Sequence, residues 1–458
     1  MRIGRWLGVL IWAALMSSIG MAGDVRVFTL QESIEYALKH SKAVALAEEK
    51  VRAAEAALME ARSRAMPQIS TNASYLYYGK LPKVTLELPA LGGLTPQPAP
   101  AMNGLQQPLT GVGLPTREMQ LTMGAKKNFQ AGVTVQQVLF AGGSIYNSIK
   151  GAELNLEAAR LDLEATRQEV IYQVKEAFYG VLLAHKLLDV ARKAVKQAEE
   201  HRKTAENLVK SGVATKYDLL RARVAVANAK SQLIQAQNAL RLAKERFKLA
   251  IGFEGPGEVD VKGELKAEEV EFDLSRLLEK ALQNRPDLRA MRLRAESASK
   301  MLNAAKGSFL PTVSLIGNYG YTDNEKQEGQ TTWSVMVRAD LPIFTGASRY
   351  SRVRQAESAM KQARLGVERM EEGVKLEVRA AYMELERARA TLEAQKEAVK
   401  QAEEGLRIAN LQYRNGVITS VQLADAELVY TQAQLGYYQA LHDYVLAIAK
   451  IKKAIGEE

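Results

Sequence analysis

Gly212-Val213-Ala214-Thr215 recurs as Gly416-Val417-Ile418-Thr419, 204 residues farther along the chain. Earlier in the chain, Pro67-Gln68-Ile69-Ser70 recurs as Pro311-Thr312-Val313-Ser314, at an offset of 244. The change of offset means that the first copy carries 40 extra residues between the two motifs. Because the matches preserve proline and glycine positions, chance similarity between two helical sequences does not explain them. The sequence therefore predicts two internal structural repeats.

Proline placement predicts the long helices. Seven of the twelve prolines lie within the 40 extra residues or at their edges, while the tract between Pro115 and Pro256 and the tract after Pro342 have none. Since proline breaks helix interiors, these two tracts are the places for long helices. Apolar residues there recur at steps of three and four, which is typical of coiled-coil packing. The predicted helices are about 147–210 and 216–251 in the first copy, and about 348–414 and 420–455 in the second.

Residues of alternating polarity predict two strands in each copy, after a first helix. The predicted strands are about 68–78 and 121–140, then about 312–322 and 331–344. Period-two alternation with tyrosines near one end is typical of a transmembrane β-strand, although a soluble hairpin gives the same pattern. The proline-rich residues 80–118 are predicted to form an exposed outer loop.

The strand count predicts the assembly. Four strands per chain cannot close a barrel, because about eight is the practical minimum. Three chains supply twelve strands, which fits a membrane barrel with C3 symmetry. The fold class is therefore predicted to be mainly α with a transmembrane β-barrel, twelve-stranded and formed by a homotrimer.

The first residues predict secretion. Arg2 and Arg5 precede a short apolar run over residues 7–16, and small residues follow, so residues 1–22 are predicted to be a signal peptide, with an uncleaved anchor as the alternative. Residues 23–252 would form the first repeat, 253–271 a linker or equatorial segment, and 272–458 the second repeat. No later stretch approaches 18 consecutive apolar residues, so no transmembrane helix is predicted.

Composition excludes several classes of function. The chain has no cysteine, and its four histidines show no ligand spacing, so no metal site is predicted. The net charge of +10 comes from Lys and Arg interleaved with Glu, which indicates solvated helix faces and not a nucleic-acid surface. Motifs typical of hydrolases, zinc proteases and phosphate loops are missing from the sequence. The chain is therefore predicted not to be an enzyme and to have no catalytic or cofactor-binding residues.

The duplicated plan, with three motifs, resembles the TolC family of outer-membrane efflux and secretion channels. These motifs are residues 30–38, Asn284-Arg285-Pro286-Asp287-Leu288 and the paired glycine turns. The resemblance implies a long-helix α-barrel continuous with the β-barrel, located in the outer-membrane lipid and extending into the periplasm. It also implies a periplasmic adaptor and an inner-membrane pump of RND, ABC or MFS type, which chooses the cargo (drugs, ions or secreted proteins). The alternative is a periplasmic coiled-coil adaptor or structural protein of an export system.

The resemblance also implies the functional residues. Adaptor docking would use the two turns, formed by Gly212, Val213, Ala214, Thr215, Gly416, Val417, Ile418 and Thr419. The candidate gate residues are Asp218, Tyr413, Gln422 and Asp425. Ile418 stands where the family has an arginine and Gln422 where it has an aspartate, so the family's salt link is not expected in the same form, and Arg414 and Lys216 are the candidates to replace it.

Threefold symmetry would bring three copies of each aspartate close to the axis. Such a ring attracts cations, and mutual repulsion would raise the pKa values of its carboxyl groups. Helix capping is the alternative role for Asp218 and Asp425. Because the chain ends at Glu458, without the family's C-terminal extension, equatorial structure is expected mainly from residues 253–271.

Overall fold

The computed structural model describes residues 25–89, 116–122 and 124–457. The predicted signal peptide and most of the predicted outer loop lie outside these residues. The chain divides into two compact units. The helical unit comprises Met1–Met59, Asn147–Leu302 and Arg352–Glu458, and the strand unit comprises Glu60–Tyr146 and Asn303–Ser351. Each unit is described by itself.

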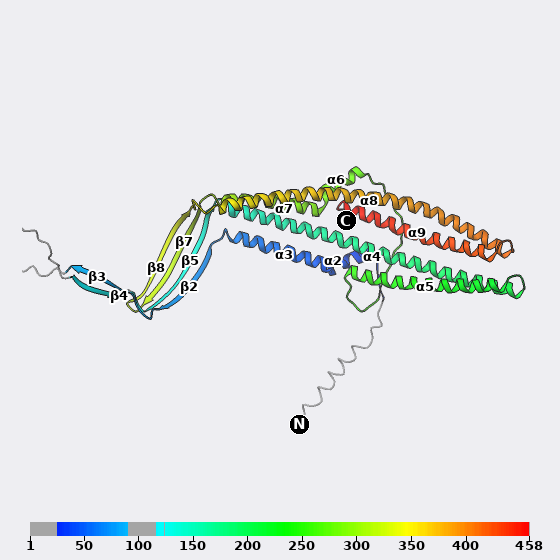
Figure 1. The fold of residues 1–458 in the computed structure, drawn as a ribbon, viewed down its shortest axis with the longest axis horizontal. Helices are drawn as coiled ribbons and strands as arrows, with labels where there is room; N and C mark the ends of the chain where they lie inside the picture. Colours follow the sequence, from blue (N-terminus) through cyan, green and yellow to red (C-terminus); the bar gives the residue numbers. More distant parts are fainter. Residues whose placement is uncertain (1–24, 90–115, 123, 458) are drawn as a thin grey trace, which may run out of the picture. The chain divides into compact units, whose positions relative to one another are not determined.

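Eight helices are present among the described residues (Figure 1). They are α2 (Leu30–His40), α3 (Lys42–Ser63), α4 (Ser144–Lys210), α5 (Lys216–Ile251), α6 (Leu274–Asn284), α7 (Pro286–Gly307), α8 (Ser348–Arg414) and α9 (Ser420–Ala454). Helices α4 and α8 each have 67 residues, which corresponds to rods of about 100 Å. No helix in the described part of the chain is both long and apolar enough to cross a membrane.

The single helix predicted before each strand pair is in fact two helices. In the second copy, Arg285 leaves the helical region with ψ at 118°, because the following Pro286 disfavours a helical residue before it. Pro286 then starts α7, where its missing N–H costs nothing. In the first copy Ser41 makes the same break with ψ at 123°, and its amide still donates to the Ala37 carbonyl at 2.7 Å.

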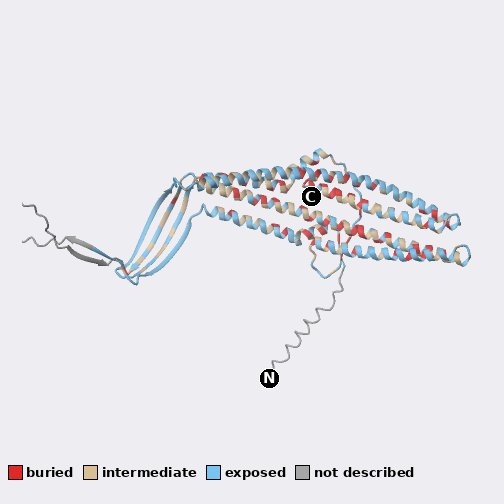
Figure 2. Ribbon diagram, in the orientation of Figure 1, coloured by how far each residue is buried: buried red, intermediate tan, exposed pale blue. Residues whose placement is uncertain are grey.

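Buried residues, in red, are spread along the long helices, and the sheet strands are mostly exposed (Figure 2). The largest cluster joins α4, α5, α8 and α9 to the linker, with Phe178, Phe247 and Ile451 among its most buried members. A short parallel pair of strands, β1 (Arg26–Phe28) and β6 (Val259–Val261), lies against this cluster. Phe28 contacts Phe247 edge to face, with ring centroids 6.1 Å apart. Strand β6 thus anchors the predicted linker, residues 253–271, to the helical core.

The strand unit contains a four-stranded antiparallel sheet. Its strands are β2 (Gln68–Tyr77), β5 (Lys127–Ala141), β7 (Thr312–Asn324) and β8 (Gln327–Asp340), in the order β2-β5-β7-β8. A separate antiparallel pair consists of β3 (Lys83–Pro89) and β4 (Thr116–Thr122).

Two strand predictions need correction here. The return strand predicted at 121–140 begins only at Lys127, because its first two residues belong to β4 and Gly124 turns the chain with φ at +92°. The described part of the predicted loop 80–118 contains β3 and the start of β4. Pro82 stands just before β3 and Pro89 ends it, so these two prolines bound the strand and do not interrupt it.

Candidate functional site

Two tight turns reverse the chain in the helical unit. The first turn (residues 211–215) joins α4 to α5, and the second turn (residues 415–419) joins α8 to α9. Gly212 and Gly416 have φ of +74° and +71°, the left-handed conformation that glycine adopts readily. The residue after each glycine closes the turn, since Val213 donates to Leu208 and Val417 donates to Gln412, both at 2.9 Å.

Threonine caps the helix after each turn. Thr215 accepts from the amide of Asp218, and the Asp218 carboxylate accepts from the Thr215 amide at 3.0 Å and from its hydroxyl at 2.7 Å. Thr419 and Gln422 make the equivalent box, with the Gln422 side-chain oxygen accepting from the Thr419 amide at 3.0 Å. The two capping boxes differ in charge, because one uses a carboxylate and the other an amide.

Asp218 also joins the two turns. Its second carboxylate oxygen accepts a hydrogen bond of 2.8 Å from the hydroxyl of Ser420, the first residue of α9. Hydrogen bonds from Thr215, and then the bond from Ser420, lower the pKa of Asp218 below its ordinary value. Asp218 therefore does cap α5, and it makes a cross-turn contact as well. The repulsion predicted for a ring of aspartates acts in the opposite direction and involves further copies of the chain.

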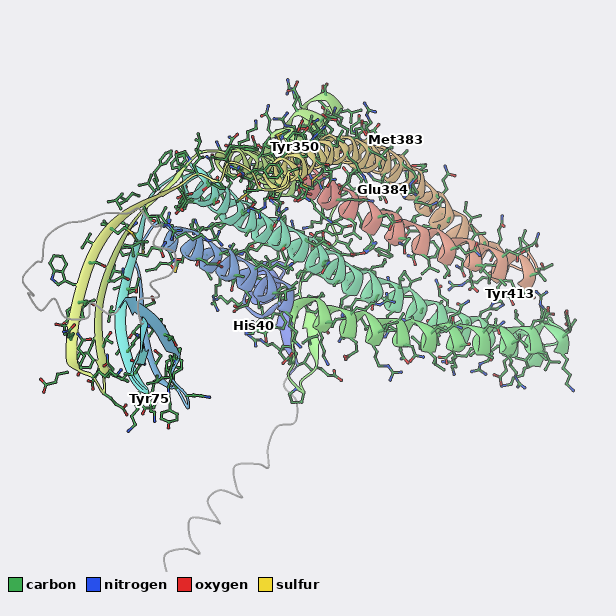
Figure 3. The ribbon with its side chains drawn as sticks, turned by 60° about the vertical axis from the view of Figure 1, so that its left-hand side comes forward. His40, Tyr75, Tyr350, Met383, Glu384 and Tyr413 are labelled. Atoms are coloured by element: carbon green, nitrogen blue, oxygen red, sulfur yellow. The ribbon has the colours of Figure 1, made fainter. Side chains whose placement is uncertain are left out.

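Tyr413 lies in the core beneath the second turn (Figure 3). It packs with Leu406, Ala409 and Leu423, and its burial, then the charges of Asp218 and Glu427, raises its pKa. The ring of His201, on α4, meets the Tyr413 ring edge to face with centroids 5.4 Å apart. His201 Nδ1 lies 3.8 Å from a carboxylate oxygen of Glu427 on α9, and Nε2 is buried with no hydrogen-bond partner.

The structure thus brings only some of the predicted gate residues together. Asp218 and Tyr413 are close enough to interact electrostatically, and Gln422 serves its own cap. Asp425 is exposed and has no hydrogen bond or ion pair within the described residues. Ile418 is half-buried against the Tyr413 cluster, while Lys216 and Arg414 are exposed. No salt link therefore replaces the family's arginine within the described part of this chain.

Sequence reasoning missed Ser420, His201 and Glu427. Ser420 carried a usable signal, because it directly follows a helix cap matched to Thr215. His201 and Glu427 carried none, since their pairing joins positions on separate hairpins that no local pattern relates.

Val213 and Val417 project from the turns and expose 73% and 69% of their surface. Tyr217 and Leu220 continue this apolar surface along the first turn of α5. Exposed apolar residues flanking a chain reversal suit contact with another protein more than chemistry on a small molecule. No group of three His, Asp or Glu side chains suited to a metal ion occurs within residues 25–89, 116–122 and 124–457.

Comparisons with known proteins all point to outer-membrane proteins. The sequence matches the family described as "Outer membrane efflux protein" over residues 33–253 and 277–457. It is 27% identical to the outer membrane protein TolC of Vibrio cholerae over 187 residues, which cover 39% of this chain and 43% of TolC. It is 24% identical to the outer membrane efflux protein BepC of Brucella suis over 329 residues, which cover 71% of each chain. The match thus spans less than half of the length of V. cholerae TolC.

Solved structures share the fold. The Campylobacter jejuni CmeC outer membrane channel superposes with a TM-score of 0.73 at 17% identity, over 93% of this chain and 85% of that one. The Neisseria gonorrhoeae MtrE outer membrane channel, in its open state, superposes with a TM-score of 0.74 at 20% identity. The superposition covers 93% of this chain and 88% of MtrE. The mainly helical fold with an accompanying strand unit is therefore that of outer-membrane channels.

Proposed function

The chain belongs to the outer membrane efflux protein family, the TolC family, and from this premise we propose that it is a trimeric channel-tunnel that exports substrates across the periplasm and the outer membrane. Its location is the cell outer membrane. The family is one of channels, and the proposal assigns no catalysis to this chain. A periplasmic adaptor and an inner-membrane pump would supply the cargo.

The observation that carries this proposal is the two-sidedness of the sheet. Residues paired across β2, β5, β7 and β8 share a face, so each cross-strand row belongs to one side. One row reads Ser70, Thr134, Asn318 and Ser334. The next row reads Thr71, Val133, Tyr319 and Trp333. Most other rows alternate in the same way, although the row of Gln68 and Gln136 also contains Ile316 and Met336.

The apolar face suits lipid. Its large side chains stand exposed in the single chain, and Trp333 exposes 78% of its surface. These exposed residues are Ile69, Tyr75, Tyr77, Phe129, Val133, Val135, Tyr319, Tyr321, Trp333, Val335 and Val337. A soluble protein would bury such a surface, whereas a transmembrane barrel places it against hydrocarbon and turns the polar face to water.

The sheet edges favour a trimer. Strands β2 and β8 each pair on one side only, which leaves one row of backbone donors and acceptors on each without partners among the described residues. In a membrane such groups must be paired, because no water is present to replace the lost bonds. Pairing β2 of one copy with β8 of the next closes the sheet, and three copies give twelve strands.

The helical unit would form the periplasmic tunnel. Each of its long helices is about 100 Å, and together with their return helices they would form an α-barrel built from two structural repeats. The two turns would then be the periplasmic tips. Val213 and Val417, exposed beside the glycines, would contact the adaptor.

Cross-linking and cell fractionation test this proposal. Outer-membrane extracts should yield a cross-linked trimer that dissociates on heating. Recovery of monomer and dimer alone would refute the trimer. Fractionation addresses the alternative of a periplasmic adaptor, because an adaptor would follow the periplasm or inner membrane.

A further inference from the structure

The polar face of the sheet is almost free of charge. Seven cross-strand rows make up this face, from the row of Leu76 to the row of Thr312. Hydroxyl and amide side chains dominate these rows, and opposed glycines, Gly132 and Gly320, occupy the centre of one. Arg338 and Asp340 are the two charged residues among these paired positions.

These two charges neutralise each other. Arg338 lies opposite Ser314 and Asp340 lies opposite Thr312, so both project from the polar face at the end of β8. Arg338 Nε is 2.9 Å from Asp340 Oδ2 and donates to Oδ1 at 3.2 Å. Both side chains are more than half exposed, so water and salt reach the pair and its contribution to stability is small. Its position suggests a role other than stability.

We propose that Arg338 and Asp340 are specificity-determining residues, whose mutual neutralisation makes the strand section of the passage indifferent to the sign of a solute's charge. This inference rests on the proposed function, since it requires the polar face to line the passage. Solutes of either sign would then meet hydroxyl and amide groups in this section. Any charge preference of the whole channel would arise outside these paired rows, as at Glu328 near the start of β8.

Threefold symmetry sets the net charge at this level of the passage. In a trimer the pair occurs three times around the axis, as a ring of three positive and three negative charges with no net charge. Removal of one partner leaves a ring of three like charges, which attracts counter-ions into the passage. At the radius of a twelve-stranded barrel and low salt, such a ring should change the ratio of cation to anion permeability by about threefold.

Reversal potentials of the full-length protein in planar bilayers, under a potassium chloride gradient at low ionic strength, test the inference. Arg338→Gln should raise the ratio of potassium to chloride permeability about threefold, and Asp340→Asn should lower it by a similar factor. The double variant Arg338→Gln/Asp340→Asn should return to the wild-type ratio, and Arg338→Lys should retain it. A double variant that shifts as far as either single variant, or single variants without any shift, would overturn the inference.

Asp323→Asn is the matched control. Asp323 pairs with Phe129 on the apolar face, so the same loss of a carboxylate should leave the ratio unchanged. A shift equal to that of Asp340→Asn would mean that position relative to the passage is irrelevant, which contradicts the inference.

Cysteine labelling separates failure of the inference from failure of the proposed function. The chain has no cysteine, so Ser334→Cys and Val335→Cys each introduce a single thiol on opposite faces of β8. A charged, water-soluble thiol reagent should change the current through Ser334→Cys and leave Val335→Cys unaffected. The reverse result, or a wild-type protein without channel current, would refute the proposed channel itself. The expected labelling without shifts at Arg338 and Asp340 would refute the inference alone.

Discussion

The first and second turns of the helical unit share a backbone and differ in polar chemistry. Both use a glycine with φ above +70° and a threonine cap. In the first turn the carboxylate of Asp218 caps the helix and also accepts a hydrogen bond from Ser420. In the second turn the cap uses the neutral side chain of Gln422. The second turn instead lies over Tyr413 and its apolar cluster. The two turns therefore reverse the backbone in the same way. The first turn has a charged cap, and the second turn has a packed apolar cluster beneath it.

The largest effect on export should come from replacing the glycine with positive φ that both turns share. Gly212→Val and Gly416→Val should each destabilise their turn by about 1–2 kcal/mol, because a β-branched residue is strained at positive φ. Nothing lies within 4 Å of a Cβ added at either glycine, so the cost is one of backbone conformation and not of packing. We expect loss of adaptor-dependent export with normal trimer assembly, measured by substrate efflux and by gel mobility.

Gly405→Val is the matched control for this pair. Gly405 lies in α8 at negative φ, with nothing within 4 Å of an added Cβ, so export should persist. Full export by both turn variants would refute the assignment of the turns as docking tips.

The next effect concerns conductance. If the turns narrow the passage, Asp218→Ala with Asp425→Ala should raise single-channel conductance and weaken cation preference, because two rings of carboxylates disappear. The single variants sharpen the comparison, since Asp218 has cross-turn contacts while Asp425 is exposed without them. Unchanged conductance and ion preference in the double variant would leave helix capping and the contact with Ser420 for Asp218, and would remove the gating role from Asp425.

A smaller effect should distinguish the two caps. In a double-mutant cycle, Asp218→Ala and Ser420→Ala should show a coupling energy of about 0.5–1 kcal/mol, typical of a partly exposed hydrogen bond to a charged group. Gln422→Ala and Ser420→Ala serve as the control pair and should be additive. Hydrogen exchange of the backbone amides at the starts of α5 and α9 would measure the coupling energy in both double-mutant cycles. Equal coupling in the two cycles would contradict the cross-turn role of Asp218.

The smallest effect should appear on acidification. Because its contacts lower the pKa of Asp218, they add stability that is complete above the ordinary aspartate pKa and is lost as the pH falls below about 4. The first turn should therefore lose protection from hydrogen exchange at pH 3 relative to pH 7, after correction for intrinsic rates. Gln422 does not titrate, so the second turn provides the internal reference. Parallel losses in both turns would point to global unfolding.

Positions with strong backbone preferences carried most of the predictive information. Glycine and proline mark the two turns and the proline-free tracts, because each restricts the backbone whatever its neighbours are. Both helix breaks were missed, although the break at Arg285 is marked by Pro286, whereas the break at Ser41 has no such marker. The β3–β4 pair was missed because prolines can end a strand as well as prevent one.

The candidate site was less accessible to prediction. The charge difference between Asp218 and Gln422 is visible in the sequence, since both follow a matched threonine. The contact between Asp218 and Ser420 joins residues 202 positions apart, and the contact between His201 and Glu427 is similarly remote. Such contacts depend on how helices pack, and helical periodicity specifies a face without specifying its partner.

The parallel pairing of β1 with β6 has a consequence for the timing of folding. Arg26–Phe28 precedes both helices of the first hairpin in the chain, and its partner Val259–Val261 follows them. Strand β1 therefore pairs with β6, and Phe28 packs on Phe247, only when residues far apart in the sequence come together. A contact of such long sequence separation closes late, and it should be among the slowest steps of maturation.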